Sequence, residues 1–338
     1  MITVYNMDVI KALKQMPSES VDMSITSPPY WGLRDYGVDG QIGLEPDFND
    51  FIKKLCDIYD EVNRVTKDDG TCWVNLGDSY YSKSGSGTGS NFEEKHKTLD
   101  GGRGKLTHMH QHKTDLKILK EKCLVCIPER FCLEMINRGW ILRNKIIWHK
   151  PNHMPTSVQD RFCNSWEYLF FFSKSKKYYF DLDAVREPHQ TNSIKRACRA
   201  RTSEKLDIGQ YSTSYKCNNV GYDDIDGKLE RGELRAVNPL GKNPDDIDDY
   251  WDITTKGVPE AHFATFPEKL ITRPIKTTKK DAVILDPFVG SGTTLKVARR
   301  LGRDSIGIEI NPEYVEIIKK RLFNGNLPLF PNEFKIIK

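Results

Sequence analysis

Two short stretches, one near each end of the 338-residue chain, have the residue types of a ligand site. Residues 26–30 read Thr-Ser-Pro-Pro-Tyr, and residues 285–294 read Leu-Asp-Pro-Phe-Val-Gly-Ser-Gly-Thr-Thr. A rigid turn that carries a hydroxyl and an aromatic ring can orient a planar substrate, and a glycine-rich turn lets a ligand approach the backbone. The pair therefore predicts a substrate site and a cofactor site.

The glycine-rich stretch lies between a predicted strand and a predicted helix. An apolar run precedes it at residues 282–285, and a helical pattern follows at residues 294–301. Gly290 and Gly292 lack a Cβ, so a ligand can come close to the backbone and to the amides of the helix start. The stretch has neither the GxGxxG pattern nor Gly-Lys-Ser/Thr, so a tight turn that binds nothing is the alternative.

Two acidic residues accompany this turn. Asp286 lies at the predicted carboxyl end of its strand, which is where parallel sheets bind ligands. Glu309 comes about twenty residues beyond the turn, at the end of a second predicted strand at residues 304–310, and an acidic side chain there commonly binds ribose hydroxyls. A ligand that contains ribose is therefore expected.

The proline-rich stretch follows a predicted strand–helix–strand unit, whose elements are residues 2–5, 7–16 and 21–26. Consecutive prolines lack amide hydrogens and have φ fixed at about −65°, so the turn is stiff and its carbonyl groups can accept hydrogen bonds. A planar ring with an amino group fits this turn. The ring would stack on Tyr30, and the amino hydrogens would bond to Ser27 and the Pro28 carbonyl. A merely rigid strand exit is the alternative.

Composition is that of a globular protein. With 38% hydrophobic residues, the chain can form one large α/β domain, or a domain with an insertion. No run of about 18 apolar residues occurs, and Met1 begins a strand pattern instead of a signal peptide, which predicts a cytoplasmic protein without membrane contact. The net charge of +4 is compatible with nucleic acid but does not indicate it. The eight cysteines favour reduced core thiols over disulfides, among them Cys56, Cys72, Cys132 and Cys163.

The two stretches together resemble the amino-group DNA methyltransferases that use S-adenosylmethionine. The catalytic motif comes first and the cofactor motif last, as in their β group, and the resemblance covers most of residues 1–187 and 250–322. Methyltransferases of ribosomal RNA or of protein glutamine usually carry Asn-Pro-Pro-Tyr after the cofactor motif. The resemblance implies an α/β fold, a doubly wound, mostly parallel Rossmann-like sheet with an inserted DNA-recognition region, in which the two turns lie at neighbouring strand ends.

The resemblance also implies roles for individual residues. The catalytic residues would be Ser27, Pro28, Pro29 and Tyr30. The residues that bind S-adenosylmethionine would be Asp8, Phe263, Thr265, Asp286, Phe288, Gly290, Gly292, Thr293 and Glu309. Contacts with double-stranded DNA would come from Lys150, Arg161, Arg196, Arg199 and Arg201. The target base would rotate out of the duplex onto Tyr30, and its amino nitrogen would attack the sulfonium methyl group in line.

Ser27 bears on which base is methylated. Within the family, Ser before Pro-Pro-Tyr usually accompanies cytosine N4 methylation and Asp accompanies adenine N6 methylation, so cytosine N4 is favoured and adenine N6 stays open. Methylation of cytosine C5 needs a cysteine nucleophile, typically after a proline, and no cysteine of this chain follows one.

The domain organisation follows from changes in composition along the chain. Residues 1–186 are predicted to form the catalytic part, 187–250 the target-recognition region, and 251–338 the cofactor-binding part of the same domain. Within the first part, residues 82–122 are rich in glycine, serine and lysine, so a flexible basic loop over DNA is expected, with an inert insertion as the alternative. Arginines of residues 190–217 could read guanine edges.

Several other features are predicted to have no chemical role. The histidines near residue 110 lack further ligands at metal-site spacing, and the Cys123–Cys126 pair has no second pair, so no metal is expected and both thiols are placed in or near the core. Apolar spacing predicts a core-facing helix at residues 47–66, ended by Asp68-Asp69-Gly70, before a strand at residues 71–76.

Three alternatives concern function and assembly. A nucleic-acid-binding module with the same fold would lack transfer, and an NAD-dependent dehydrogenase would have no use for the Ser-Pro-Pro-Tyr turn. A companion restriction endonuclease is a further candidate partner, and the protein is expected to be a monomer or a homodimer.

Overall fold

A computed structural model describes residues 1–33, 37–81, 118–153, 155–187, 250–255, 266–323 and 333–338. The chain divides into two units, Met1–Phe180 together with Asp249–Lys338, and Asp181–Asp248. In the second unit the described residues include a short 3₁₀ helix, η1 (Asp183–Val185). The predicted target-recognition region at residues 187–250 and the basic loop at residues 82–122 lie almost entirely outside the described residues, so both stay predictions.

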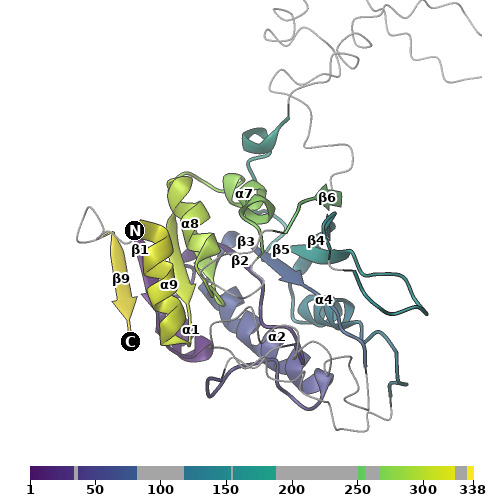
Figure 1. Cartoon of the computed structure of the whole chain (residues 1–338). Helices are drawn as coiled ribbons and strands as arrows, with labels where there is room; N and C mark the ends of the chain where they lie inside the picture. The colour runs from purple at the N-terminus through teal and green to yellow at the C-terminus, as the bar shows by residue number, and fades with distance from the viewer. Residues whose placement is uncertain (34–36, 82–117, 154, 188–249, 256–265, 324–332) are drawn as a thin grey trace, which may run out of the picture. The chain divides into compact units, whose positions relative to one another are not determined.

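The larger unit is built on a nine-stranded sheet with the order β6-β4-β5-β3-β2-β7-β8-β1-β9 (Figure 1). Within this sheet only β5 runs antiparallel to its neighbours β3 and β4, and the other pairs are parallel, which confirms the predicted fold class. The strands are β1 (Ile2–Tyr5), β2 (Val21–Thr26), β3 (Thr66–Leu76), β4 (Ile141–His149), β5 (Trp166–Ser173), β6 (Tyr250–Asp252), β7 (Val283–Asp286), β8 (Asp304–Ile308) and β9 (Phe334–Ile337).

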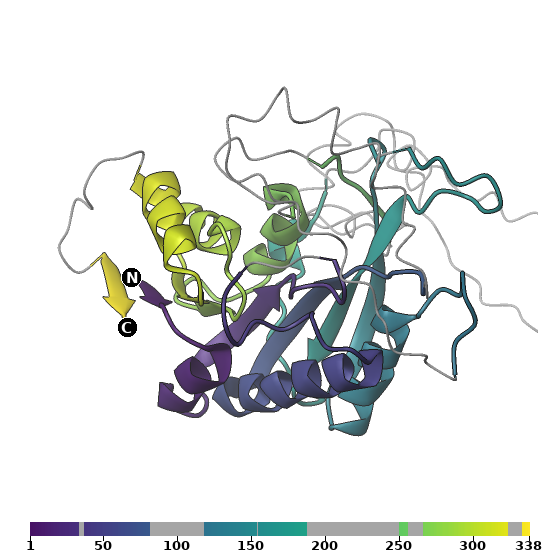
Figure 2. The ribbon, with the colours of Figure 1, turned by 60° about the horizontal axis from the view of Figure 1, so that its bottom comes forward.

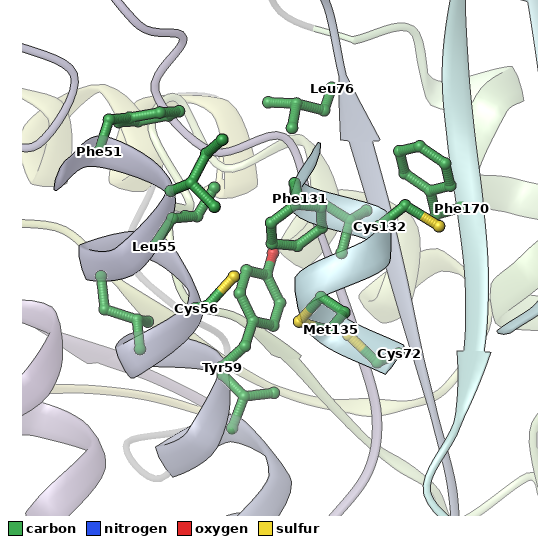
Figure 3. Packing of buried hydrophobic residues seen from close by; sticks show 14 of the residues in the cluster. Phe51, Leu55, Cys56, Tyr59, Cys72, Leu76, Phe131, Cys132, Met135 and Phe170 are labelled. Carbon is green, nitrogen blue, oxygen red and sulfur yellow. The ribbon is translucent and has the colours of Figure 1, made fainter. Parts of the chain in front are cut away.

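One face of the sheet is covered by α1 (Val9–Gln15), α2 (Phe48–Val65) and α4 (Ile127–Asn137) (Figure 2). Apolar residues at helical spacing place one side of α2 in the core, where Phe51, Leu55 and Tyr59 are fully buried. Figure 3 shows Tyr59 facing Phe131 of α4, and their ring centroids are 5.3 Å apart. Alternate residues of β3 and β5, such as Leu76, complete this cluster because successive strand residues point to opposite faces.

The opposite face is covered by α7 (Glu268–Lys276), α8 (Thr293–Arg300) and α9 (Pro312–Phe323). Residues of the other strand parity, including Ile25 and Ile284, pack there against Leu270 and Val297. The sheet thus lies between two helical layers, which buries both of its faces and explains why its parallel strands read as apolar runs.

The strand order places the two chemically suggestive turns side by side. Strand β2 pairs in parallel with β7, with Met23 opposite Ile284 and Ser24 opposite Leu285. Both strands therefore end at the same edge of the sheet, β2 at Thr26 before the proline-rich turn and β7 at Asp286 before the glycine-rich turn. The predicted meeting of the two turns is confirmed.

Several elements differ from the predictions. The helix at α2 ends at Val65, and Asp68-Asp69-Gly70 lies inside β3, where the pairing with β2 shifts register. Gly70 is needed for close approach, since a Cβ there would lie 2.5 Å from Thr66 Cγ2 and 2.9 Å from the Asp22 carbonyl oxygen. Strand β9, which pairs with β1, was not predicted.

The cysteine prediction is correct for the core and wrong for two residues. Cys56, Cys72 and Cys132 are buried and free. Cys123 and Cys163 are exposed, because the first lies in the turn before α4 and the second in the connection between β4 and β5, and neither belongs to a packed face. No helix among the described residues is long and apolar enough to span a membrane.

Candidate active site

The proline-rich turn presents a serine hydroxyl and a tyrosine ring at the carboxyl end of β2. Ser27 Oγ donates a hydrogen bond to Tyr30 Oη at 3.5 Å. A hydroxyl oxygen that donates in this way keeps its lone pairs available to accept. Ser27 and Tyr30 are both partly buried, so the turn is neither sealed in the core nor fully in solvent.

Tyr30 is held by polar residues from two other strands. Its hydroxyl donates to Glu167 Oε2 of β5 at 2.8 Å and lies 3.3 Å from Asn75 Oδ1 of β3. Asn75 Nδ2 also donates to Glu167 Oε2 at 3.1 Å, and Lys150 Nζ binds Glu167 Oε1. The strands therefore hold the hydroxyl through a charge-assisted hydrogen bond inside a closed polar network.

Sequence reasoning assigned no role to Asn75 or Glu167. Each stands inside an apolar strand pattern, where a polar residue that is half-buried must find a partner. That mismatch was the available signal, but it does not identify the partner. Only the pairing of β3 with β5, which sets Asn75 opposite Leu169, brings the two side chains together under Tyr30.

Gly77 makes room for the tyrosine ring. A Cβ at this position would lie 2.6 Å from Tyr30 Cε2 and 3.1 Å from Glu167 Oε1. Real side chains do not tolerate such contacts, so the residue after β3 must be glycine for Tyr30 to reach Glu167.

Residues that follow the turn fix it from the other side. Trp31 is 2% exposed, and its Nε1 donates to the Glu45 carbonyl at 2.8 Å. Glu45 Oε2 accepts from the Gly43 amide at 2.8 Å, and the Gly32 amide donates to the Gly43 carbonyl at 2.8 Å. These bonds return the chain toward Tyr30 and limit its freedom to move.

Asp286 organises the glycine-rich turn from within. It is 1% exposed; its Oδ1 accepts from the Phe288 amide at 3.0 Å, and its Oδ2 accepts from Thr294 Oγ1 at 2.5 Å. Burial raises the pKa of Asp286 to about 6, although the hydroxyls of Thr26 and Thr294 and the Phe288 amide favour the charged form. Asp286 thus ties the end of β7 to the start of α8.

The two glycines of the turn have different surroundings. Both have positive φ, 49° at Gly290 and 84° at Gly292. A Cβ at Gly290 would meet only the Phe288 carbonyl oxygen, at 4.0 Å, so space lies beside that backbone. A Cβ at Gly292 would lie 3.0 Å from Ile318 Cγ1, so this glycine permits close packing on α9. Gly290 is therefore the glycine whose surroundings suit a ligand.

Glu309 lies at the carboxyl end of β8, next to the strand that carries Asp286. The Asn311 amide donates to Glu309 Oε1 at 2.8 Å. Burial raises the pKa of Glu309 to about 7, while the amides of Asn311 and Gly290 favour the charged form and the nearby Asp286 carboxylate disfavours it. The predicted ribose-binding carboxylate and the glycine-rich turn are thus adjacent.

Asp8 follows β1, which is paired with β8. Its side chain accepts from the Lys11 amide at 3.0 Å and caps α1. The preceding Asn6 donates through Nδ2 to the Glu309 carbonyl at 2.8 Å, so this segment lies beside the predicted ribose site. The position agrees with the predicted adenine contact, which stays a prediction.

The other predicted site residues divide into three groups. Thr293 is buried and accepts from Arg321 Nη1 at 3.3 Å, and Phe288 is partly buried against the first core cluster. Lys150 is engaged with Glu167 and lies over the Trp148 ring, 4.3 Å from its centroid, so its predicted contact with DNA stays untested. Outside the described residues lie Phe263, Thr265, Arg196, Arg199 and Arg201.

One cluster of metal-ligand type occurs among the described residues. Ligand atoms of Asp78, Cys126 and Glu129 lie within 4.8 Å of one another. Asp78 accepts from the Cys126 amide at 3.0 Å and the Ile127 amide at 3.0 Å, which caps the start of α4. Capping gives Asp78 a structural role that needs no ion.

A family model described as DNA methylase, of the N6/N4 methyltransferase type, matches residues 21–320. This match spans both turns and most of the sheet. The chain belongs to this family of DNA methylases.

Relatives of this DNA methylase share most of its length. Type II methyltransferase M.SmaI of Serratia marcescens is 37% identical over 316 residues, which cover 93% of this chain and 88% of that protein. Type II methyltransferase M.Cfr9I of Citrobacter freundii is 37% identical over 322 residues, which cover 95% of this chain and 87% of that protein. The family resemblance expected from the two motifs is confirmed, and a dehydrogenase is excluded.

Solved structures share the fold of this DNA methylase at lower identity. The modification methylase TTHA0409 of Thermus thermophilus, complexed with S-adenosyl-L-methionine, has a TM-score of 0.56 and 20% identity, over 100% of this chain and 98% of that chain. The cytosine-N4-specific PvuII DNA methyltransferase has a TM-score of 0.56 and 21% identity, over 97% and 88%. At these identities the likeness shows a common fold.

Proposed function

We propose that this DNA methylase transfers a methyl group from S-adenosylmethionine to the exocyclic amino group of a base rotated out of DNA, with cytosine N4 as the acceptor. The observation that carries this proposal is the adjacency of two turns at the carboxyl ends of β2 and β7. One turn has the ring and hydroxyl for an aminated base, and the other has an open glycine beside an acidic residue. Such an edge is where doubly wound sheets bind ligands.

Tyr30 and Ser27 would bind and orient the target base. The Tyr30 ring offers a face for stacking, and its hydroxyl is fixed by Glu167, so the ring plane is set before the base arrives. Ser27 donates to Tyr30 and thereby turns its lone pairs toward other donors, such as the amino hydrogens of the base. The Pro28 carbonyl would accept the second amino hydrogen. This geometry aligns the nitrogen for attack, after which its proton passes to solvent.

Glu309, Gly290 and Asp8 would hold the cofactor. S-adenosylmethionine supplies a methyl group activated by a sulfonium. Glu309 would accept from its ribose hydroxyls, and the backbone at Gly290 leaves space for the ligand. TTHA0409, which has the same fold, is complexed with S-adenosyl-L-methionine. Asp286 would act through the turn that it ties together, because both of its carboxylate oxygens are bonded within the protein.

Cytosine N4 is the preferred acceptor because Ser27 precedes Pro-Pro-Tyr. The PvuII enzyme of the same fold is named cytosine-N4-specific, which agrees with this choice. Adenine N6 is the alternative, since both amino groups can donate two hydrogen bonds to the same turn. Double-stranded DNA is the proposed substrate, and the type II relatives support a restriction–modification context with a companion endonuclease.

The test is to incubate plasmid DNA with the protein and S-adenosylmethionine, digest it to nucleosides, and identify the modified base by mass. N4-methylcytosine supports the proposal, and N6-methyladenine supports the alternative. Unmodified DNA from a folded protein that binds S-adenosylmethionine would refute methyl transfer to DNA. Tight DNA binding without transfer would favour the non-catalytic module.

A further inference from the structure

The connection between β4 and β5 begins and ends at the candidate active site. It comprises residues 150–165, of which the structure describes all but residue 154. Its neck is closed by a hydrogen bond from the Lys150 amide to the Ser165 carbonyl at 2.7 Å. Lys150 Nζ binds Glu167, which accepts from Tyr30. The connection therefore borders the place proposed for the target base, and it extends away from the sheet as a teal loop in Figures 1 and 2.

Three contacts hold the tip of this loop. The Arg161 guanidinium lies over the Tyr80 ring, 3.9 Å from its centroid. Tyr80 Oη donates to Asn164 Oδ1 at 3.3 Å, and Lys122 Nζ pairs with Asp160 Oδ2 at 2.7 Å. Contacts on both sides of residue 162 give the tip a defined orientation.

Phe162 stands between these contacts and is 95% exposed, the largest exposure among the large apolar side chains that the structure describes. Single apolar residues are common on protein surfaces. Phe162 differs because its loop is anchored by bonds that leave the ring in water instead of folding it inward. Its neighbour Arg161 donates to the Phe162 carbonyl at 3.1 Å, which directs the backbone and not the ring.

We propose that Phe162 is an apolar wedge that enters the DNA duplex where the target base leaves the stack. This inference rests on the proposed DNA methylation. Rotating a base out leaves an unstacked gap, and apolar side chains that enter such gaps offset part of the unstacking cost. Arg161 and the exposed Lys122 flank Phe162 and supply cations for the adjacent phosphates, while Asp160 is neutralised by Lys122.

The experiment compares Phe162→Ala with the wild type in single-turnover methyl transfer on two duplexes. Both contain the sequence that the wild type methylates, determined beforehand from modified plasmid DNA. In the first duplex the target base is paired, and in the second it faces an abasic site, so that less pairing energy opposes its rotation. Val158→Ala, at a 40% exposed residue of the same loop, is the matched control. Calorimetry with S-adenosylmethionine checks that each variant is folded.

Phe162→Ala is expected to slow transfer at least tenfold on the paired duplex and at most about threefold on the duplex with the abasic site. Phe162→Trp, which keeps a flat apolar ring, should restore most of the rate on the paired duplex. Wild-type rates on both duplexes would overturn the wedge, as would an equal loss on both. If the wild type itself modifies no DNA, the proposed function fails; normal methylation by Phe162→Ala rejects the wedge alone.

Discussion

Tyr30 Oη donates a hydrogen bond of 2.8 Å to Glu167 Oε2, across 137 positions of sequence. Through this bond an antiparallel strand, β5, holds the catalytic turn that follows the parallel strand β2. The carboxylate is shared with Asn75 and Lys150, so it is tied to β3 and β4 as well. The network makes Glu167 a positioning residue for the ring on which the base is proposed to stack.

This relationship predicts coupled effects of Tyr30→Phe and Glu167→Gln. Each change weakens the same charge-assisted hydrogen bond, which is worth about 1.5–3 kcal/mol, so each should lower kcat roughly tenfold with little change in the Kd of S-adenosylmethionine. The double variant should be little slower than the slower single variant, because the two changes remove one shared interaction. Glu134→Gln, which removes a carboxylate paired with Arg138 on α4, is the control. Additive losses of kcat would contradict the shared bond.

Substitutions in the two turns should separate chemistry from cofactor binding. Tyr30→Ala removes the stacking face and should lower kcat by at least a hundredfold while calorimetry still detects S-adenosylmethionine. Asp286→Ala leaves the Phe288 amide and Thr294 hydroxyl without their acceptor and should weaken cofactor binding about tenfold or more. Asp281→Ala, an exposed residue just before β7, serves as the control. The opposite pattern would reverse the assigned roles.

The raised pKa of Glu309 predicts a pH dependence of cofactor binding. Its carboxyl has a pKa of about 7, so it is mostly ionised at pH 8 and mostly protonated at pH 6. If the ionised form accepts from ribose hydroxyls, the Kd of S-adenosylmethionine should rise about tenfold as the pH falls from 8 to 6. Glu309→Gln should remove most of that slope. An unchanged slope in this variant would assign the titration to another group.

The same carboxyl makes a signed contribution to folding. The unfolded chain ionises Glu309 near its ordinary pKa of 4.5, whereas the folded chain keeps the proton up to about pH 7. Between these values the folded state binds more protons, so the free energy of unfolding due to this group falls as the pH rises from about 4.5 to 7. Denaturant unfolding of the wild type and Glu309→Gln over this range measures the difference.

Gly77→Ala should disturb Tyr30 without touching a ligand. The new Cβ would lie 2.6 Å from the Tyr30 ring and must displace it from Glu167. We expect kcat to fall at least tenfold and the tyrosine hydroxyl to lose its hydrogen bond, with cofactor affinity retained. Adding Tyr30→Phe should cost little more, since the bond is already lost. Full activity of Gly77→Ala would show that the ring does not need its present position.

Local patterns were enough to predict β1 and β2 with their observed bounds, the burial of one face of α2, and the strand–turn–helix at residues 283–300. These features depend on hydrophobic period and on the turn preferences of proline and glycine, which act within a few residues. The two motifs and their order also determined the family. Local patterns failed at Gly70, which resembled a helix end but lies in a strand where two backbones approach closely.

Tertiary structure alone decided what surrounds the chemical groups. The strand order brought Ser27 and Gly290 to one edge of the sheet, and the pairing of β3, β4 and β5 assembled Asn75, Lys150 and Glu167 around the Tyr30 hydroxyl. Such contacts join residues far apart in the chain, and a polar side chain does not encode which distant partner will satisfy it. For that reason the sequence determined the kind of chemistry, and the fold determined which residues hold it in place.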